Sequence, residues 1–216
     1  MISSNLKKRI YTSIILFLLI YLMVSFNIVL VYSLIVLGIL SILEFLNITK
    51  KFIKNIFYIF MFNSIFIFYI FIFCFLFFFF SNFVQLKIIL ISLLLGCIAS
   101  DMGGFIFGKI FKGPKLTKIS PNKTFSGACG SIFFTALVMG SSMFYFTKNF
   151  SYMFLIVSFV TSLACQCGDL LFSFLKRKAK IKDTGNFLPG HGGILDRLDG
   201  ILLGIPIGFI SIIIIF

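Results

Sequence analysis

Long apolar runs, broken by short polar stretches, dominate this chain from one end to the other. A helix that crosses a bilayer needs ~20 mostly apolar residues, and about seven segments meet that requirement. We predict membrane-spanning helices at 10–26, 28–47, 56–80, 84–107, 127–147, 151–174 and 199–216. The span at 56–80 is long enough to tilt or to contain a break, so the count ranges from about six to eight. The predicted fold is an all-α, polytopic helical membrane bundle.

Composition supports this assignment and excludes a soluble domain. The chain is 60% hydrophobic and 12% charged, with a mean hydropathy of +1.16. A soluble domain of this length would carry far more polar surface. The 33 phenylalanines and the absence of tryptophan are typical of a genome rich in A and T. We therefore interpret the phenylalanine run at 77–80 as lipid-facing, and not as an aromatic binding site.

Positive charge is distributed in a way that predicts the orientation of the spans. The net charge is +13, and the basic clusters fall at 7–9, 50–54, 109–123 and 176–182. With seven spans and a cytoplasmic N-terminus, all four clusters lie on the cytoplasmic side, as the positive-inside rule requires. The first span has no evident cleavage site, so we expect a retained anchor. No nucleic-acid-binding motif accompanies the charge, and we expect membrane lipids, not nucleic acid, as partners.

Polar residues concentrate in the second half of the chain. We divide the sequence into N-terminal spans, 1–83, and a region, 84–216, that carries two polar loops at 109–126 and 175–198. Small residues recur at four-residue spacing in two spans of this second region, namely Gly96, Ser100, Gly104 and Gly108, and then Gly200, Gly204 and Gly208. Such faces predict close helix packing in lipid, and they leave a homodimer open.

Four of the six acidic residues lie between Asp169 and Asp199. Asp196 and Asp199 are three residues apart, so on a helix they project to one side. With Asp169 nearby, they would suit a hard cation such as Mg²⁺, which prefers oxygen ligands. The alternative is that these carboxylates form ion pairs with neighbouring cations, namely Lys176, Arg177 and Arg197. Two further carboxylates, Asp101 and Glu44, lie within spans, where each needs a partner or a water-filled cavity.

Both polar loops have features of phosphate-binding segments. The run from Pro189 to Gly193 contains three glycines, which permit positive φ and a close approach of backbone N–H groups to a ligand. A plain connecting turn is the other interpretation, and the role of His191 stays open among general base, phosphate donor and loop residue. The loop from Lys109 to Thr124 ends in Ser120-Pro121-Asn122-Lys123-Thr124 beside a predicted helix start, a reasonable phosphate cradle. Its lysines could equally serve only as topology determinants.

Taken together, these motifs resemble the C-terminal signature of the bacterial phosphatidate cytidylyltransferases, also called CDP-diacylglycerol synthases. The resemblance rests on Ser173-x-x-Lys176-Arg177, Lys182-Asp183, Leu188-Pro189-Gly190-His191-Gly192-Gly193 and Asp196-Arg197-x-Asp199. The upstream Asp101-x-Gly103-Gly104 block, the Ser120 to Thr124 run and Glu44-Phe45 are similar to further blocks of the same family. One departure is Ser126, at a position before Gly127 where the family usually has glutamate.

The resemblance implies transfer of CMP from CTP to phosphatidic acid, with release of pyrophosphate, by an enzyme of the bacterial inner membrane whose site faces the cytoplasm. It implies Mg²⁺ as cofactor, held by Asp169, Asp196 and Asp199, and leaves open a second metal or a monovalent ion. Further catalytic residues would be Lys176, Arg177, Asp183, His191 and Arg197. Substrate-binding residues would be Asp101, Ser120, Lys123, Thr124, Gly190, Gly192 and Gly193.

Two other functions compete with this one. An integral membrane prenol or lipid kinase would also use CTP, but its acceptor is a neutral alcohol that must lose a proton. A small ion-coupled transporter would use Asp101, Asp169 and Glu44 as ion sites inside the membrane. It predicts carboxylates near the middle of the membrane, whereas most of those in this chain lie at or beyond the predicted cytoplasmic ends of the spans.

Overall fold

Helices account for nearly all of the described chain. The computed structural model describes residues 15, 18–19, 21–23, 25–117, 119–148, 151–185, 187 and 192–215. Within these residues the helices are α2 (Asn27–Phe52), α3 (Ile56–Ser81), α4 (Val84–Phe111), α5 (Phe125–Thr147), α6 (Met153–Lys178) and α7 (Leu195–Ile215). All six are long and apolar enough to cross a membrane. The fold is that of a polytopic helical membrane protein, as predicted.

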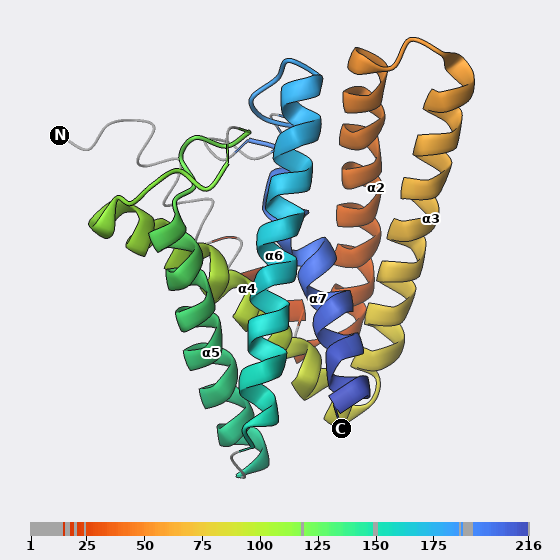
Figure 1. The fold of residues 1–216 in the computed structure, drawn as a ribbon. Coiled ribbons are helices and arrows are strands. Elements are labelled where there is room, and N and C mark those ends of the chain that lie inside the picture. The colour runs from red at the N-terminus through yellow and green to blue at the C-terminus, as the bar shows by residue number, and fades with distance from the viewer. Residues whose placement is uncertain are drawn as a thin grey trace, which may run out of the picture. The chain divides into compact units, whose positions relative to one another are not determined.

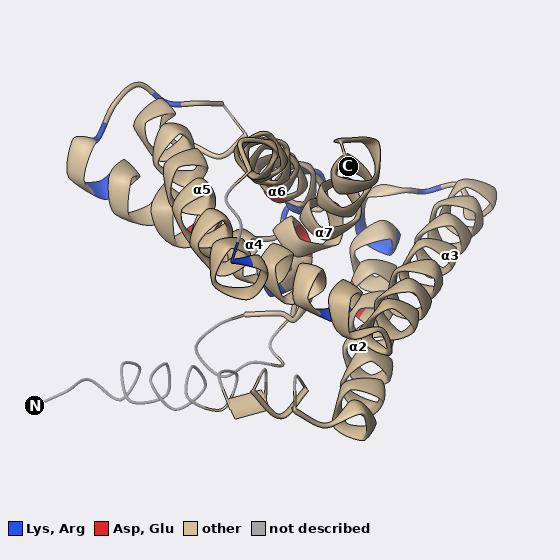
Figure 2. Cartoon of the chain, turned by 90° about the horizontal axis from the view of Figure 1, so that it is seen from below, with Lys and Arg blue, Asp and Glu red and all other residues tan. Residues whose placement is uncertain are grey.

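The predicted spans match these helices closely. The segment predicted at 56–80 is one unbroken helix, α3. Helices α2, α4, α6 and α7 extend beyond the predicted apolar spans into polar residues, because backbone hydrogen bonding continues through residues such as Lys50 and Lys51. Most of the span predicted at 10–26, and with it the predicted anchor, lies outside the described residues. Figure 2 shows the described helices almost free of charged residues except towards their ends.

The chain groups into two compact units. The first comprises Met1–Asn82 and Leu175–Leu198, and the second comprises Phe83–Phe174 and Asp199–Phe216. Helices α2 and α3 therefore belong to the first unit and α4 and α5 to the second, whereas α6 and α7 each contribute residues to both. We call residues 179–194, which connect α6 to α7, the signature loop. This loop groups with α2 and α3, although the sequence placed it within the region 84–216.

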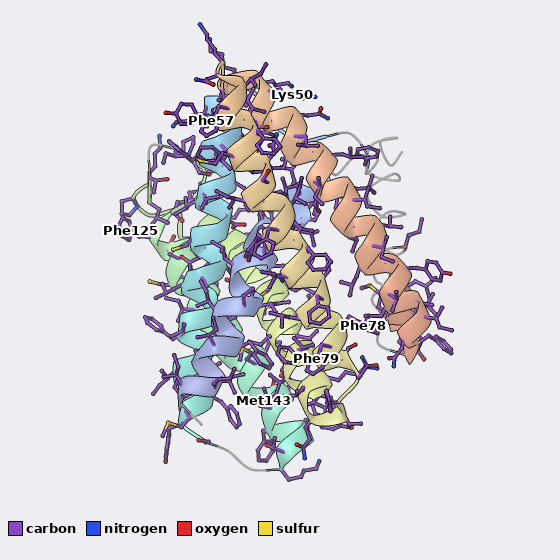
Figure 3. The ribbon with its side chains drawn as sticks, turned by 90° about the vertical axis from the view of Figure 1, so that its right-hand side faces the viewer. Lys50, Phe57, Phe78, Phe79, Phe125 and Met143 are labelled. Carbon is purple, nitrogen blue, oxygen red and sulfur yellow. The ribbon has the colours of Figure 1, made fainter. Side chains whose placement is uncertain are left out.

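In the first unit, α2 and α3 run side by side and are joined by a short turn (Figure 1). The Asn55 side chain caps α3 by accepting from Phe57 N at 2.9 Å. A buried hydrogen bond of 2.9 Å joins Thr49 to Asn63, and Phe45 stacks on Phe66. On its other face α3 presents exposed aromatic rings, Phe57, Phe78 and Phe79 among them (Figure 3). In the run at 77–80, which was predicted to face lipid, Phe78 and Phe79 are exposed and Phe77 and Phe80 are half-buried.

In the second unit, small residues allow α4 and α5 to touch through their backbones. A Cβ atom added to Gly103 would lie 2.5 Å from the Gly130 carbonyl oxygen, so no side chain fits there. Ser131 Oγ donates to the Ser100 carbonyl at 2.7 Å, and Ser100 meets Ser162 of α6 at 3.2 Å. These contacts confirm that the small-residue face of α4 is used for helix packing.

The glycine face of α7 is also covered by helices of the same unit. A Cβ atom at Gly204 would collide with the sulfur atoms of Cys165 and Cys97, and one at Gly208 would lie 2.6 Å from Leu93. The prediction of close packing is confirmed here too. The homodimer that these faces left open stays a prediction, and the described part of α7 already uses its glycines within one chain.

Candidate functional site

Asp196 organises the signature loop in the first unit. Its Oδ1 accepts from Lys176 Nζ at 2.7 Å. Its Oδ2 accepts from two backbone amides, Thr184 N at 2.8 Å and Gly193 N at 3.0 Å. The Lys176 and Asp196 side chains are 13% and 10% exposed, so the ion pair is largely shielded from solvent. One carboxylate thus joins the end of α6, the signature loop and the first turn of α7.

Gly192 lies against this carboxylate in a conformation that favours glycine. Its φ is +83°, and an added Cβ atom would lie 3.0 Å from Asp196 Oδ2 and 3.4 Å from Asp183 Cβ. The sequence predicted that glycines in this loop would permit positive φ, and Gly192 confirms it. His191 and Gly190, which were predicted to take part in the site, lie outside the described residues.

Glu44 of α2 is a second carboxylate bound to the signature loop. It is 1% exposed, and its oxygens accept from Thr184 Oγ1 at 2.7 Å, Ile194 N at 2.9 Å and Leu195 N at 2.9 Å. The sequence showed that a carboxylate within a span needs a partner, but it did not indicate these partners. Nothing in the local pattern around Glu44 points to residues 140 or more positions away.

The second unit contains a separate lysine–aspartate pair. Lys123 Nζ donates to Asp169 Oδ2 at 2.8 Å, and the two side chains are 28% and 22% exposed. The loop before α5 holds Lys123 by its backbone: Leu116 N donates to the Lys123 carbonyl at 2.7 Å, and Lys123 N donates to Ser120 O at 3.0 Å. The loop backbone therefore fixes the point from which the lysine reaches α6.

Thr124 and Ser126 build the start of α5. Thr124 Oγ1 accepts from Gly127 N at 3.1 Å, the usual geometry of a helix N-cap. Its hydroxyl also meets Ser126 Oγ at 3.0 Å. Ser126, the position where the resemblance leads one to expect glutamate, thus supports the cap with a hydroxyl. Thr124 has a structural use here, and its predicted contact with phosphate stays a prediction.

Asp199 joins Asp169 in the second unit, where α6 and α7 cross at two glycines. A Cβ atom at Gly168 would collide with the Asp199 carbonyl oxygen, and one at Gly200 would lie 3.3 Å from Asp169 Oδ1. Asp199 is 9% exposed, and its Oδ1 accepts from Gly200 N at 2.9 Å. The two glycines let the backbones approach closely enough to bring both aspartates to one crossing.

The carboxylate oxygens of these aspartates can be compared with the ligands that Mg²⁺ requires. Mg²⁺ is usually held by one or two carboxylates together with water and substrate phosphates. Asp169 and Asp199, at one helix crossing, fit that requirement. Asp196 fits less well, because both of its oxygens already accept from Lys176 or backbone amides. Among the described residues, no three His, Cys, Asp or Glu side chains gather as a closed metal site, so any such ion would depend on substrate oxygens and water.

The remaining predicted residues are more peripheral. Asp101, Arg177, Asp183 and Arg197 are exposed, and Ser120 is half-buried. Asp196 forms an ion pair with Lys176, which the ion-pair alternative named. Asp169 also forms an ion pair, but its partner is Lys123, which that alternative did not name. The structure thus forms two groups among the predicted residues. The first unit brings together Lys176, Gly192, Gly193 and Asp196. In the second unit, Lys123 pairs with Asp169, whose Oδ1 lies beside Gly200, the residue after Asp199.

Comparison with known proteins places this arrangement in a family. The model of the cytidylyltransferase family matches residues 2–215, which is nearly the whole chain. The chain therefore belongs to the cytidylyltransferase family.

Individual relatives agree with that family. Phosphatidate cytidylyltransferases from Rickettsia felis, Mycobacterium leprae and Helicobacter pylori are 44%, 43% and 46% identical to it over 133, 116 and 117 residues. Those matches cover 56%, 51% and 53% of this chain and 58%, 36% and 43% of the relatives. The chain thus matches from about a third to three fifths of each relative's length.

Proposed function

We propose that this chain transfers CMP from CTP to phosphatidic acid, giving CDP-diacylglycerol and pyrophosphate. The observation that carries the proposal is the complete signature from Ser173 to Asp199 in a chain of the cytidylyltransferase family. The relatives named phosphatidate cytidylyltransferase support the choice of substrates. The many apolar helices suit an enzyme whose acceptor is a membrane lipid.

The reaction is an in-line displacement at phosphorus. A phosphate oxygen of phosphatidic acid attacks the α-phosphorus of CTP, and the bond from that phosphorus to the bridging α–β oxygen breaks, so that pyrophosphate leaves. The attacking oxygen is already anionic, and no strong general base is needed. The main difficulty is that two polyanions must approach each other. Catalysis then depends on positioning them and on stabilising the charge that develops on the leaving group.

In the second unit, Lys123 and the crossing of α6 and α7 would bind phosphate and metal. Lys123 places a cation beside Asp169, which would neutralise phosphate charge when substrate is bound. Asp169 and Asp199 would hold Mg²⁺, which supplies further positive charge to phosphate oxygens when bound. Ser120, whose carbonyl fixes the Lys123 backbone, belongs to the same loop. Asp101 would contribute from α4.

In the first unit, the signature loop would recognise the nucleotide. Gly192, which is half-buried and has a positive φ, would bring its backbone N–H close to phosphate. Cations from the adjoining helix ends, Lys176, Arg177 and Arg197, would offset the repulsion between the substrates. Asp196 keeps Lys176 in place through their ion pair. Asp183 would support the loop beside Gly192, and His191 would contact the nucleotide.

The location of the reaction follows from its substrates. CTP is a cytoplasmic metabolite and phosphatidic acid a membrane lipid, so the site belongs at the cytoplasmic headgroup level of the bacterial inner membrane. The positive-inside pattern supports that side for both polar loops, because their basic clusters at 109–123 and 176–182 fall there.

A turnover assay tests the proposal. Protein purified in detergent would be incubated with labelled CTP, phosphatidic acid and Mg²⁺, with and without EDTA. We expect CDP-diacylglycerol and pyrophosphate in equal amounts, and none after chelation. Phosphate transfer to a prenol, with no product from phosphatidic acid, would replace the proposal with a lipid kinase. No transfer to either acceptor would contradict both enzyme assignments.

A further inference from the structure

Glu44 is a buried carboxylate with no cation beside it among the described residues. Neither ion pair of the described chain includes it, yet the side chain is only 1% exposed. Burying an uncompensated carboxylate is costly, and such groups persist when several hydrogen bonds satisfy them. Here the bonds come from one hydroxyl and two backbone amides, at 2.7, 2.9 and 2.9 Å. All three donors belong to the signature loop or to the first residue of α7.

Two of those donors explain why a carboxylate is useful at this point. Ile194 N and Leu195 N lie at the N-terminus of α7, where the first amides of a helix have no partner within the helix. Negative charge is favoured there by the helix dipole. A helix usually obtains such a cap from a nearby residue of its own chain segment. In this protein α2 supplies it from 150 positions away.

Glycines make room for the carboxylate on both sides. A Cβ atom at Gly185 would lie 2.5 Å from Glu44 Oε1, and one at Gly193 would lie 2.5 Å from Glu44 Oε2. For Gly185, the three atoms nearest to that added Cβ all belong to the Glu44 side chain. The absence of a side chain at Gly193 is thus explained by the packing of Glu44, independently of nucleotide binding.

Glu44 and Asp196 hold the same stretch of backbone through different atoms. Asp196 accepts from Thr184 N and Gly193 N, whereas Glu44 accepts from the Thr184 hydroxyl and from the two amides that follow Gly193. Loss of either carboxylate would free one set of donors and leave the other in place. The backbone from Gly193 to Asp196 is therefore fixed by two acidic side chains, only one of which lies in the signature.

We propose that Glu44 is a positioning residue for the signature loop. It touches no substrate, and it sets the backbone that presents Gly193 and Asp196. This inference rests on the proposed function, because that function assigns the signature loop to CTP. The consequence is a coupling between an N-terminal span and nucleotide binding.

The substitution E44Q tests this role directly, because glutamine keeps the size of the side chain and removes one hydrogen-bond acceptor. Every neighbour that the carboxylate contacts by hydrogen bond is a donor. Either orientation of an amide would therefore point an NH₂ group at a backbone N–H. We expect E44Q to raise the KM for CTP about tenfold, the scale of one hydrogen bond to a charged group. The KM for phosphatidic acid should change less than twofold, because the signature loop is assigned to CTP. A general loss of folded protein would lower the maximal rate and would change neither KM.

Hydrogen exchange gives a readout that needs no turnover. One of the two amides, Ile194 N or Leu195 N, should exchange about tenfold faster in E44Q than in the unsubstituted protein, because they bond to different oxygens of Glu44 and glutamine keeps only one oxygen. The amides of α5 should be unchanged. T184S keeps the hydroxyl bonded to Glu44 and should behave like the unsubstituted protein in both measurements. Unchanged exchange at Ile194 and Leu195 in E44Q would overturn the proposal.

A double-substitution cycle tests the contact in a second way. G185A should displace the Glu44 carboxylate and speed exchange at Ile194 and Leu195, but in an E44A background it should add nothing, because the atoms it would meet are gone. G140A is the matched control, since a Cβ atom at Gly140 meets nothing within 4 Å. An equal effect of G185A in both backgrounds would contradict the proposal. If the unsubstituted protein made no CDP-diacylglycerol, the proposed function would fail while the exchange results still decided the role of Glu44.

Discussion

The two lysine–aspartate pairs in the described part of the chain have the same chemistry and different surroundings. In the first unit, Lys176 and Asp196 are 13% and 10% exposed, and the aspartate also accepts from two backbone amides. In the second unit, Lys123 and Asp169 are 28% and 22% exposed. Among the described residues, the Asp169 side chain accepts one hydrogen bond, from Lys123. Asp196 accepts hydrogen bonds through both of its oxygens, whereas Asp169 accepts from Lys123 through Oδ2.

This difference separates two tasks that a carboxylate can perform. A carboxylate whose oxygens are all used by backbone and lysine donors fixes structure, and it can bind a metal ion only by giving up those bonds. A carboxylate with one lysine partner can exchange that partner or share it with a phosphate group. We therefore assign the organisation of the signature loop to Asp196. Under the proposed function, metal and phosphate binding would fall to Asp169 with Asp199.

The largest expected effect comes from removing the charge of Asp169. D169N should lower turnover by about 10²–10³-fold, the scale of losing one preorganised electrostatic contribution to the transition state. Stability should change by less than about 1 kcal/mol, because the pair with Lys123 is partly exposed. The checks are turnover of labelled CTP and the melting temperature in detergent. K54Q, in the turn between α2 and α3, is the control with normal turnover. Near-normal activity of D169N would remove Asp169 from the site.

An intermediate effect is expected on stability from breaking the more buried pair. K176M should lower the free energy of unfolding by about 2 kcal/mol, between the values for exposed and fully buried pairs, because Asp196 would lose its cation. The melting temperature in detergent measures this loss. Hydrogen exchange of the Thr184 and Gly193 amides should become faster, because Asp196 would be held less firmly without Lys176. A melting temperature equal to that of the unsubstituted protein would mean that Asp196 is organised by the backbone amides alone.

The smallest stability effect is expected at the other lysine. K123M should lower the free energy of unfolding by less than about 1 kcal/mol, because the ion pair of Lys123 with Asp169 is more exposed. Its effect should appear instead as a higher KM for CTP, because a phosphate-binding cation is lost. K123R, which keeps the charge, should recover most of that KM. If K123M destabilised the protein as much as K176M, the distinction between the two pairs would be wrong.

Much of the fold could be predicted from hydropathy, but the helix ends could not. The span predicted at 127–147 is α5, which begins two residues earlier because Thr124 caps it. The span predicted at 151–174 continues as α6 to Lys178, since a helix that leaves the apolar region can extend through lysine and arginine. The length of an apolar run indicates which residues lie in lipid. Capping residues and tertiary contacts determine where the helical hydrogen bonding stops.

The sequence predicted a set of candidate site residues, but it did not predict which of them lie together. The sequence singled out Asp169, Asp196 and Asp199 as one metal-binding set, because their spacing favours proximity. The structure engages Asp196 with Lys176 and two amides, and brings Asp169 to Asp199 at the glycines of α6 and α7. Residue types showed which side chains can carry the chemistry, but backbone contacts between helices determined which of them meet.

By itself, the sequence determined a multi-pass helical protein and its family, because long apolar runs and a contiguous signature are local properties of the chain. Only the tertiary structure decided that Glu44 caps α7 and that Gly185 and Gly193 leave room for it. Glu44 lies 140 to 151 residues from its hydrogen-bond partners. No local pattern encodes such a contact, because a buried carboxylate is satisfied by whichever donors the folded chain brings to it.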